Sequence, residues 1–594
     1  MAEFKNPGQQ GGQDNKSLLV MMLVMVVVFF GLQLYKSRTT PPAASPNAAQ
    51  TASQSAPAAP ALAATNAAPG TAASASPAAP VLQAAGESTT VVENELYRIQ
   101  FSNRGGQVTS WLLKRLKAND GKPLDLVHAQ AAQHFGYPLS LYTYDPAFTS
   151  TLNQALYVPS ATGTLAAPAT LTFKFSDGTT QVTKTFTFDE TYVLHADVSV
   201  THNGAPVRAL ISWPSGLGDQ DNTSAYNGAQ LDTMRDSKVD HIAFKKVTGG
   251  ETLNGPFDWA GVSDPYFAAV FLPDSPDTAT VAALNNQLDV SKTIRRTGLG
   301  SSSKGPIMVP ILGAAVGDTS GDTHLRIFAG PKAISVLKAI HATNSKVTLE
   351  PVLEFGFFGL IGKYLFLALQ FIHSHIASNW GWSIVILTVA INLLILPLRV
   401  KTMQSGLKMQ RIQPQMDAIK EKYKKYKVTD PKRNEMNAEI MQLQKDNGVN
   451  MFGGCIPTLI QMPLLFAFFG MLPKVVELRQ AHWFWLPDLT AADPYHILPI
   501  VMVISQFLVQ FYTPSPGVDP QQQKMMAFMM PAFSGYMTWN YASGLALYWS
   551  VGNLIGIAQQ AVMNRTSLGR EMREIAAKRA RRKAGTGATI QGRR

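Results

Sequence analysis

The sequence contains a single cysteine, Cys455, among 594 residues. No intramolecular disulfide is possible, so any large domain outside the cytoplasm must be held together by its core alone. Cys455 opens an apolar run, where a small buried hydrophobic role is favoured over a reactive thiol.

The sequence also lacks the patterns that carry covalent chemistry. It has no nucleotide-binding loop, no nucleophile constellation and no metal-ligand spacing, so we expect no enzyme, no cofactor and no metal. The histidines of its middle third are scattered with no motif to pair them: His128, His134, His195, His202, His241 and His324.

Charged residues make up only 15% of the chain, against 46% hydrophobic residues. The apolar residues are clustered in runs, which is typical of a membrane protein with a substantial soluble part. The net charge of +12 lies mostly in segments that we interpret as cytoplasmic loops. This distribution argues against a uniformly basic nucleic-acid binder, and no DNA partner is expected.

The chain is organised around the apolar run from Trp380 to Leu398, which is about as long as a helix crossing roughly 30 Å of hydrocarbon. Its interior carries Thr388 and Asn392, and each polar side chain there must find a partner or water. The following residues, 399–450, contain twelve Lys and Arg against six Asp and Glu. By the positive-inside bias this loop is cytoplasmic.

The first 88 residues divide into an anchor and a linker. Ser17 to Tyr35 is apolar and follows Lys5 and Lys16, so residues 1–38 are interpreted as a cytoplasmic segment and an uncleaved signal anchor, with a cleaved signal peptide as the alternative. Residues 39–88 are rich in Ala, Pro and Ser and predict a disordered linker.

Residues 89–352 alternate apolar and polar positions between turn residues, which predicts a β-sandwich domain. Leu171, Phe173 and Phe175 are one such strand, and Asp177-Gly178 supplies a hairpin turn. The opening VENELYRIQFSNRGGQVTSWLLK resembles the start of galactose-mutarotase-like supersandwiches. A scaffold role is favoured over sugar acid–base catalysis, because no histidine is paired with a carboxylate by any motif.

Residues 353–378 are apolar but striped with polar positions, which predicts an amphipathic helix lying along the outer membrane interface. A transmembrane span at residues 353–378 would place the basic loop outside.

Within residues 400–450, apolar positions recur at intervals of three and four on both sides of a Thr429-Asp430-Pro431 turn. This predicts a hairpin of two antiparallel helices. Its charged face, including Lys420, Lys424 and Lys425, is either a docking surface or merely solvated.

Four more spans are predicted at 455–472, 495–512, 524–540 and 545–563, which place the carboxyl end in the cytoplasm. The tail, 566–594, is strongly basic and includes Arg579, Arg581 and Arg582. It either meets anionic lipid or ribosomal RNA, or serves positive-inside retention alone.

Several long motifs occur in order in the carboxyl half: NWGWSIVILTVAINLLILPL, FGGCIPTLIQMPLLFAFFGML, VELRQA, DLTAADPYHILPI, DPQQQKMMAFMMP and SGLALYWSVGNLIGIAQQ. With them the chain resembles the YidC/Oxa/Alb family of membrane-protein insertases. The anchor, linker and β domain match the long form of Gram-negative bacteria. The resemblance implies a mixed membrane protein with five core transmembrane helices in 379–565, an N-terminal anchor helix, a cytoplasmic helical hairpin and a periplasmic β-supersandwich domain.

The resemblance also implies a location and a mechanism. The protein would lie in the inner membrane and would insert and help fold membrane proteins, alone or with the Sec translocon. A hydrophilic groove would open to the cytoplasm and to lipid. The implied partners are nascent membrane proteins, the ribosome, the Sec translocon and membrane lipids.

One position departs from the family. The groove arginine of the family aligns with Asn392, which can hydrogen-bond a substrate but cannot attract an acidic flank by charge. Arg399, seven residues on, is a candidate replacement if the helix continues past Pro397, or else an ordinary interface anchor. The other groove candidates are Thr388, Gln461, Met502, Tyr548 and Trp549, and hydrogen bonding between helices is the alternative for the polar ones.

Two other functions remain to be weighed. A solute transporter would be expected to show repeated halves, which the sequence lacks. A membrane-tethered periplasmic carbohydrate-binding protein would place its function in the β domain.

Overall fold

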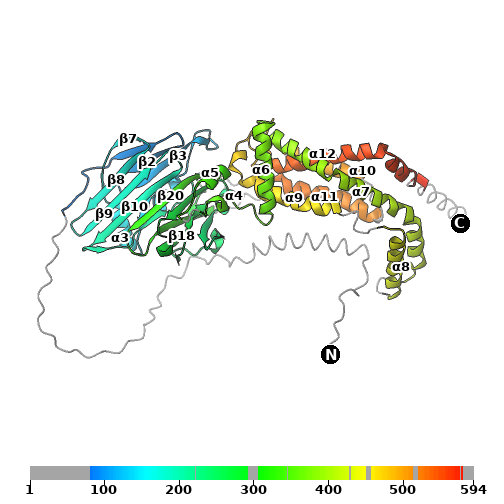
Figure 1. Ribbon diagram of the computed structural model, residues 1–594, viewed down its shortest axis with the longest axis horizontal. Helices are drawn as coiled ribbons and strands as arrows, with labels where there is room; N and C mark the ends of the chain where they lie inside the picture. Colours follow the sequence, from blue (N-terminus) through cyan, green and yellow to red (C-terminus); the bar gives the residue numbers. More distant parts are fainter. Residues whose placement is uncertain are drawn as a thin grey trace, which may run out of the picture. The chain divides into compact units, whose positions relative to one another are not determined.

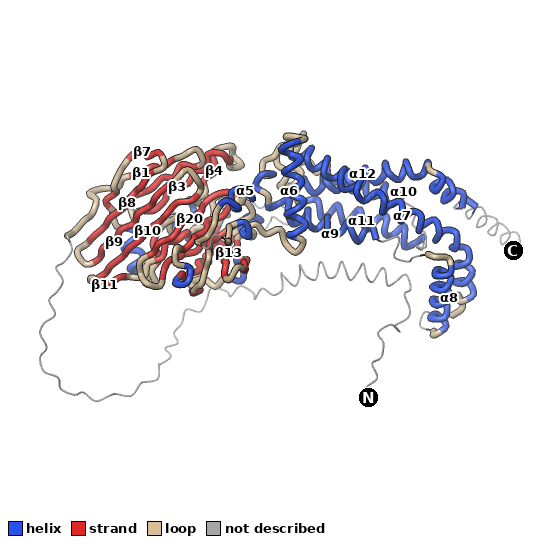
Figure 2. The backbone as a smooth tube through the Cα atoms, viewed as in Figure 1, coloured by secondary structure: helices blue, strands red, loops and turns tan. Residues whose placement is uncertain are grey.

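The computed structural model describes residues 80–220, 223–291, 306–343, 346–426, 430–449, 456–512, 520–575 and 577–578. The chain forms two compact units that divide between Val352 and Leu353, hereafter the β domain and the helical domain. Strands build the first unit and helices the second (Figure 2). The predicted anchor helix, most of the predicted linker, and Arg579, Arg581 and Arg582 lie outside the described residues.

The β domain is built from strands whose side chains alternate between core and surface, as the sequence pattern predicts. In β8 (Ala169–Ser176), Leu171, Phe173 and Phe175 are buried. β8 pairs with β9 (Thr180–Phe188) around a turn in which the Asp177 carboxylate accepts from the amides of Thr179 and Thr180. This Asx turn fixes the register of the hairpin.

The described strands of the β domain form three sheets (Figure 1). One five-stranded sheet has the order β4 (Pro123–Asp125), β3 (Gln107–Lys117), β2 (Tyr97–Ser102), β1 (Thr89–Glu93), β7 (Gly163–Ala166). The ten-stranded sheet runs β14 (Lys238–Ala243), β13 (Gln230–Arg235), β16 (Trp259–Ser263), β17 (Phe267–Pro273), β20 (Thr323–Pro331), β10 (Val193–His202), β9, β8, β6 (Val158–Pro159), with β11 (Ala205–Pro206) on β10. The third is β15 (Thr252–Asn254), β18 (Ala279–Asp289), β19 (Met308–Asp318), β12 (Leu210–Trp213), β5 (Ser140–Tyr142). Short helices cover their margins: α2 (Ala129–Phe135), α3 (Pro146–Gln154), α4 (Thr223–Asn227) and α5 (Ile334–Ala339).

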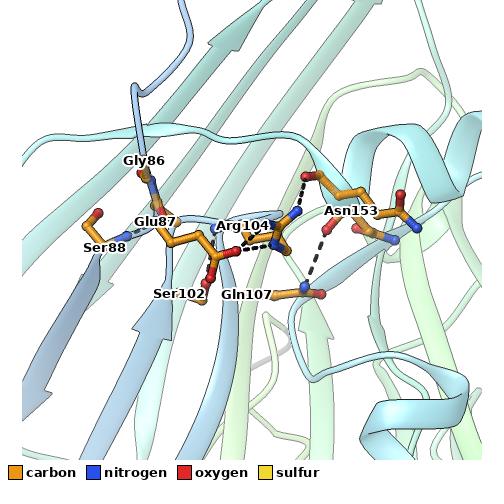
Figure 3. A network of polar contacts seen from close by, with 9 residues as sticks. Gly86, Glu87, Ser88, Ser102, Arg104, Gln107 and Asn153 are labelled. Atoms are coloured by element: carbon orange, nitrogen blue, oxygen red, sulfur yellow. Dashed lines mark hydrogen bonds and ion pairs between the residues drawn. The ribbon is translucent and has the colours of Figure 1, made fainter.

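The last residues of the predicted linker are bound to the β domain, which corrects the expectation that the linker is disordered up to residue 88. Leu82 forms a β-bridge with Ser176, and its amide donates to the Ser176 carbonyl over 2.8 Å. The Arg104 guanidinium binds the Glu87 carboxylate and the Gln154 carbonyl (Figure 3). Composition alone missed this docking, because the contacts are made by backbone groups and one ion pair.

A buried cation lies in the core of the β domain. Lys184 is fully buried, and its Nζ donates to the carbonyls of Gly105, Gly106 and Leu139 at 3.0, 2.7 and 2.6 Å. Gly105 and Gly106 have φ values of 71° and 53°, a region that favours glycine. Lys184 therefore stabilises a turn whose carbonyls would otherwise be buried without donors.

The helical domain contains α6 (Gly359–His375), α7 (Trp380–Lys422), α8 (Lys432–Asp446), α9 (Ile456–Met471), α10 (Ile497–Tyr512), α11 (Pro520–Trp539) and α12 (Ser543–Arg565). Asn379 caps α7, since its carboxamide oxygen accepts from the amides of Gly381 and Trp382. Asp493 similarly accepts from the amides of Tyr495 and Leu498 ahead of α10.

α7 is one helix of 43 residues, whereas the sequence pattern suggested a span and a separate hairpin arm. Pro397 and Pro414 both lie inside it. Each proline removes one backbone hydrogen bond, which kinks a helix without necessarily ending it. The far half of α7 packs against α8 through a cluster of Ile412, Met416 and Val449, with Met409, Ile440 and Leu443 around it.

Within the described residues, α7 alone is both long and apolar enough to cross a membrane, and the apolar stretches of α9 and α10 are shorter. α11 and α12 are long but less apolar, because they carry buried polar residues, namely Ser534, Thr538, Ser543, Ser550 and Asn553. Five crossing helices therefore remain a prediction.

α6 is apolar on two sides. Leu365, Phe366 and Leu369 are buried against the helical domain, while Leu360 and Tyr364 are 71% and 64% exposed. Its placement at a membrane interface remains a prediction.

Candidate functional site

The helices of the bundle form an open arc. α9 packs against α7, α7 against α12, α12 against α10, and α10 against α11. The two ends of the arc, α9 and α11, are not closely packed against each other over their described residues.

One end of the bundle is tightly packed. The rings of Phe468 on α9 and Tyr548 on α12 are stacked with centroids 4.1 Å apart. Phe469 stacks on Tyr541 at the same centroid distance of 4.1 Å, and the Tyr541 hydroxyl donates to the Phe469 carbonyl over 2.7 Å. All residues of α12 from Ser543 to Tyr548 are buried. This end is closed by aromatic packing.

The opposite end is loosely packed. Beyond Asn553, the residues of α12 are half-buried or exposed up to its last residue, Arg565. α10 likewise has no buried residue between Ser505 and Phe511. On α7, burial is interrupted between Asn392 and Leu407. The bundle is thus tightly packed at one end and loosely packed at the other.

A polar seam joins α7 and α12. The Thr388 hydroxyl donates to the Ile384 carbonyl over 2.7 Å, and Asn392 Nδ2 donates to the Thr388 carbonyl over 2.8 Å. The glycines of α12 let its backbone approach: a Cβ added at Gly552 would lie 4.0 Å from Asn392 Nδ2, and one at Gly556 would lie 3.3 Å from Arg399 Nη1.

Arg399 reaches back along α7 to Asn392. Its Nη2 donates to Asn392 Oδ1 over 3.1 Å, and its Nη1 donates to Gln559 Oε1 over 2.7 Å. Gln559 Nε2 in turn donates to the Asn392 carbonyl over 3.4 Å. Two helical turns separate Arg399 from Asn392, and side chains in a helix tilt toward its amino terminus, so the guanidinium is directed toward Asn392.

A second polar contact lies on the other side of α12. Asn553 Nδ2 donates to Ser505 Oγ on α10 over 3.1 Å, and both residues are buried. The buried Ser550 hydroxyl makes no hydrogen bond among the described residues. Sequence analysis missed these residues and Gln559, although Gln559 lies eleven residues after Tyr548 and so on the same face of the helix.

The predicted site residues are only partly brought together. Thr388, Asn392 and Arg399 share the seam, and Tyr548 lies at the closed end. Met502 on α10 is fully buried, as is Thr388, so its contact with a substrate stays a prediction. Gln461 and Trp549 are half-buried on α9 and α12.

The hairpin lysines are distributed over different environments. Lys424 forms an ion pair with Glu421 at 3.0 Å, and Lys425 Nζ lies 5.3 Å from the centre of the Tyr426 ring. Lys420 is half-buried. None of these contacts identifies a partner.

Two described histidines of the β domain are paired with carboxylates: His241 with Asp232 at 2.7 Å and His324 with Asp197 at 2.6 Å. No cluster of His, Cys, Asp or Glu that could hold a metal occurs in the described part of the chain.

A β-rich domain and a helical bundle, with one described helix long and apolar enough to cross a membrane, are the architecture of a membrane protein with a large domain outside the bilayer. The sequence profile of the 60Kd inner membrane protein matches residues 371–570, and that of the YidC periplasmic domain matches residues 89–368.

Individual relatives agree with these profiles. Membrane protein insertase YidC of Geobacter sulfurreducens is 33% identical over 484 residues, which are 79% of this chain and 85% of that protein. Its counterpart from Ralstonia nicotianae is 32% identical over 533 residues, covering 88% and 90%. A crystal structure of an active YidC insertase with its first transmembrane domain resolved has 17% sequence identity and a TM-score of 0.33, covering 82% of this chain and 95% of that one.

The chain belongs to the YidC family of membrane protein insertases. Membership confirms the predicted family and the insertase function, and it places the chain in the inner membrane with a periplasmic β-rich domain.

Proposed function

We propose that this chain inserts membrane proteins by admitting the polar flank of a nascent segment into the groove between α7, α9, α10 and α12. The apolar part of the segment then moves into lipid through the opening between α9 and α11. The observation that carries this proposal is the contrast between the closed end at Tyr548 and the open end beyond Asn553.

The groove would lower the free-energy cost of moving the polar flank into the membrane. Each polar group moved into hydrocarbon without a partner costs several kcal/mol. A groove that offers Asn392, Arg399, Gln559 and water over half the depth of the bilayer lowers that cost. Neither a sealed pore nor nucleotide hydrolysis is required for this step.

We infer a topology of five core spans, formed by the first half of α7 and by α9 to α12. The open end would face the cytoplasm, because the basic residues 399–450 and the basic tail lie on that side. α9 and α10 have 16 residues each, so each rises about 24 Å, less than the roughly 30 Å of a typical hydrocarbon core. Such short helices favour a locally thinned bilayer.

Arg399 is the candidate cation of the groove. Because its guanidinium lies at Asn392, it would deliver positive charge near the position where the family carries its arginine. Arg399 would then attract acidic flanks, while Thr388 and Asn392 would hydrogen-bond polar ones. Tyr548 would close the outer end, and Gln461 and Trp549 would line the walls.

The remaining partners follow from charge and location. The hairpin with Lys420, Lys424 and Lys425, together with the tail, would dock the ribosome or anionic lipid heads. α6 would lie at the outer interface with Leu360 and Tyr364 toward lipid. The Sec translocon would act with this chain on some substrates. The sequence lacks the repeated halves that a transporter would be expected to show.

Photo-crosslinking tests the groove. A photoreactive amino acid would replace Asn392, and a ribosome-stalled nascent chain with one span would be the target. Leu394 is the matched control, because it is 82% exposed on the same helix. Adducts at position 392 that exceed those at position 394 are expected. Adducts confined to position 394 would contradict a polar route and favour a purely apolar surface.

Deleting the β domain distinguishes an insertase from a periplasmic carbohydrate-binding protein. A chain without residues 89–352 is expected to retain insertion in cells depleted of the native protein. Complete loss of insertion with normal accumulation of the shortened chain would instead place function in the β domain.

A further inference from the structure

Arg399 is not fixed in the groove by its own helix alone. It lies beyond Pro397, near the open end of the bundle, and a side chain of this length reaches either toward Asn392 or out toward water. Arginines near the end of a span ordinarily extend their charge toward the interface. The inward direction therefore has to be stabilised by specific acceptors.

Two acceptors provide that stabilisation, and they come from different helices. Asn392 Oδ1 lies 3.1 Å from Nη2, and Gln559 Oε1 lies 2.7 Å from Nη1. The shorter of the two contacts is made by Gln559. Gln559 is itself oriented, since its Nε2 donates to the Asn392 carbonyl over 3.4 Å. The carboxamide of Gln559 is thus held with its oxygen toward the guanidinium.

Both acceptors are neutral, so they hold the guanidinium without cancelling its charge. A carboxylate at either position would form an ion pair and remove the positive potential of the groove. A carboxylate brought by a substrate would bind the guanidinium more strongly than a carboxamide does and displace it. The guanidinium is thus kept in the groove with its charge uncompensated, and it can exchange its neutral acceptors for the carboxylate of a ligand.

We propose that Gln559 is a positioning residue that holds the guanidinium of Arg399 inside the groove, so that the positive charge of the groove depends on Gln559. Without Gln559 the guanidinium turns to the cytoplasmic interface and the groove becomes nearly neutral. The positive charge of the groove therefore depends on the conformation of one side chain, because Arg399 has a second conformation in which its guanidinium lies in water. This inference deepens the proposed function and rests on it only for its biological purpose.

The test measures the electrostatic potential in the groove directly. Cys455 is replaced by serine, which removes the only native thiol, and Gly552 is replaced by cysteine. A Cβ at position 552 would lie 3.9 Å from Thr388 Cγ2 and 4.0 Å from Asn392 Nδ2, which is ordinary contact. The full chain in lipid vesicles is then treated with an anionic and a cationic methanethiosulfonate reagent. The ratio of the two reaction rates reports the local potential.

Gln559→Leu is expected to lower the ratio of anionic to cationic rates about tenfold. Arg399→Gln should lower it equally, and the double variant should lower it no further. Gln559→Glu keeps the shape and the acceptor and should also lower the ratio, because it neutralises the guanidinium in place. Gln560→Leu is the matched control: Gln560 is the neighbouring glutamine and donates to Asn564 instead. Its ratio should remain unchanged.

A ratio that falls with Arg399→Gln but not with Gln559→Leu would overturn the positioning role of Gln559. A ratio unaffected by either change would show that the guanidinium contributes no potential to the groove. These rates are measured without any substrate, so either failure is distinguishable from a failure of insertion through the groove.

Discussion

Arg411 on α7 is ion-paired with Glu571, and its Nε donates to the Glu571 carboxylate over 2.9 Å. The two residues are 160 positions apart in the sequence, the same separation as between Arg399 and Gln559. The same separation of 160 residues holds near the start of both helices, because a Cβ added at Gly544 of α12 would lie 3.4 Å from Ile384 Cδ1 of α7. α7 and α12 therefore run parallel in one register, and the residues after Arg565 continue it along the second half of α7.

The first prediction concerns the contact between Arg411 and Glu571. Arg411→Glu or Glu571→Arg should each lower the hydrogen-exchange protection of amides 567–575 about two- to fivefold, as expected for an exposed ion pair. The double reversal should restore most of the protection. High salt should lower protection in the native chain but not in Arg411→Glu. Equal losses in the single and double variants would mean that the pair does not hold this segment.

The second prediction concerns the closed end of the groove. Phe468→Ala should lower the free energy of unfolding of the helical domain by about 3 kcal/mol, because it removes a fully buried ring stacked on Tyr548. Tyr548→Phe keeps the ring and should cost much less. Thermal unfolding in detergent measures both changes. Equal effects of the two variants would show that stacking does not hold this end together.

The third prediction concerns Lys184 in the β domain. Burial lowers the pKa of Lys184 from 10.5 to about 7, so between these values the unfolded chain binds the proton and the folded chain releases it. Stability should therefore rise with pH between about 7 and 10.5 relative to Lys184→Met, since the unfolded state binds more protons there. At pH 7 itself, Lys184→Met should destabilise the domain, because three carbonyls lose their donors.

Unfolding by urea, followed by proteolysis of the β domain in the full chain, measures this difference at each pH. Lys174 on β8 is exposed and serves as the control in Lys174→Met. A difference between native and variant chains that stays constant from pH 7 to 10 would show that the three carbonyls keep Lys184 protonated.

The sequence was informative wherever a periodic pattern is long. The strand alternation of Leu171, Phe173 and Phe175 and the turn at Asp177 follow from side-chain spacing alone. The helices of the bundle likewise follow from their apolar runs. Local rules were less reliable at prolines: Pro397 and Pro414 suggested boundaries, yet the packing of both halves of α7 outweighs the loss of one hydrogen bond at each.

The sequence alone could not predict which polar side chains of different helices contact each other. The seven-residue spacing to Asn392 suggested Arg399, but nothing in that spacing identifies Gln559, which comes from a helix 160 residues away. Asn553 and Ser505 were missed for the same reason. Which polar residues of a span face each other depends on helix register, which is set by tertiary packing.

The last prediction concerns a buried polar group in the hairpin. Gln444 on α8 is 5% exposed; its Nε2 lies 3.9 and 4.0 Å from the sulfurs of Met409 and Met416, and its Oε1 has no hydrogen-bond partner among the described residues. Replacing a buried group that lacks a partner by an apolar one of similar size removes its desolvation cost. Gln444→Met should therefore stabilise the pairing of α8 with α7 by about 1 kcal/mol.

Hydrogen exchange of the α8 amides measures this change, with Gln442→Met as the control on the exposed face of the same helix. Slower exchange in Gln444→Met alone is the expected result. Faster exchange would mean that the Gln444 carboxamide binds a group or a water that methionine cannot replace, and that the polar residue contributes to the pairing of α7 and α8.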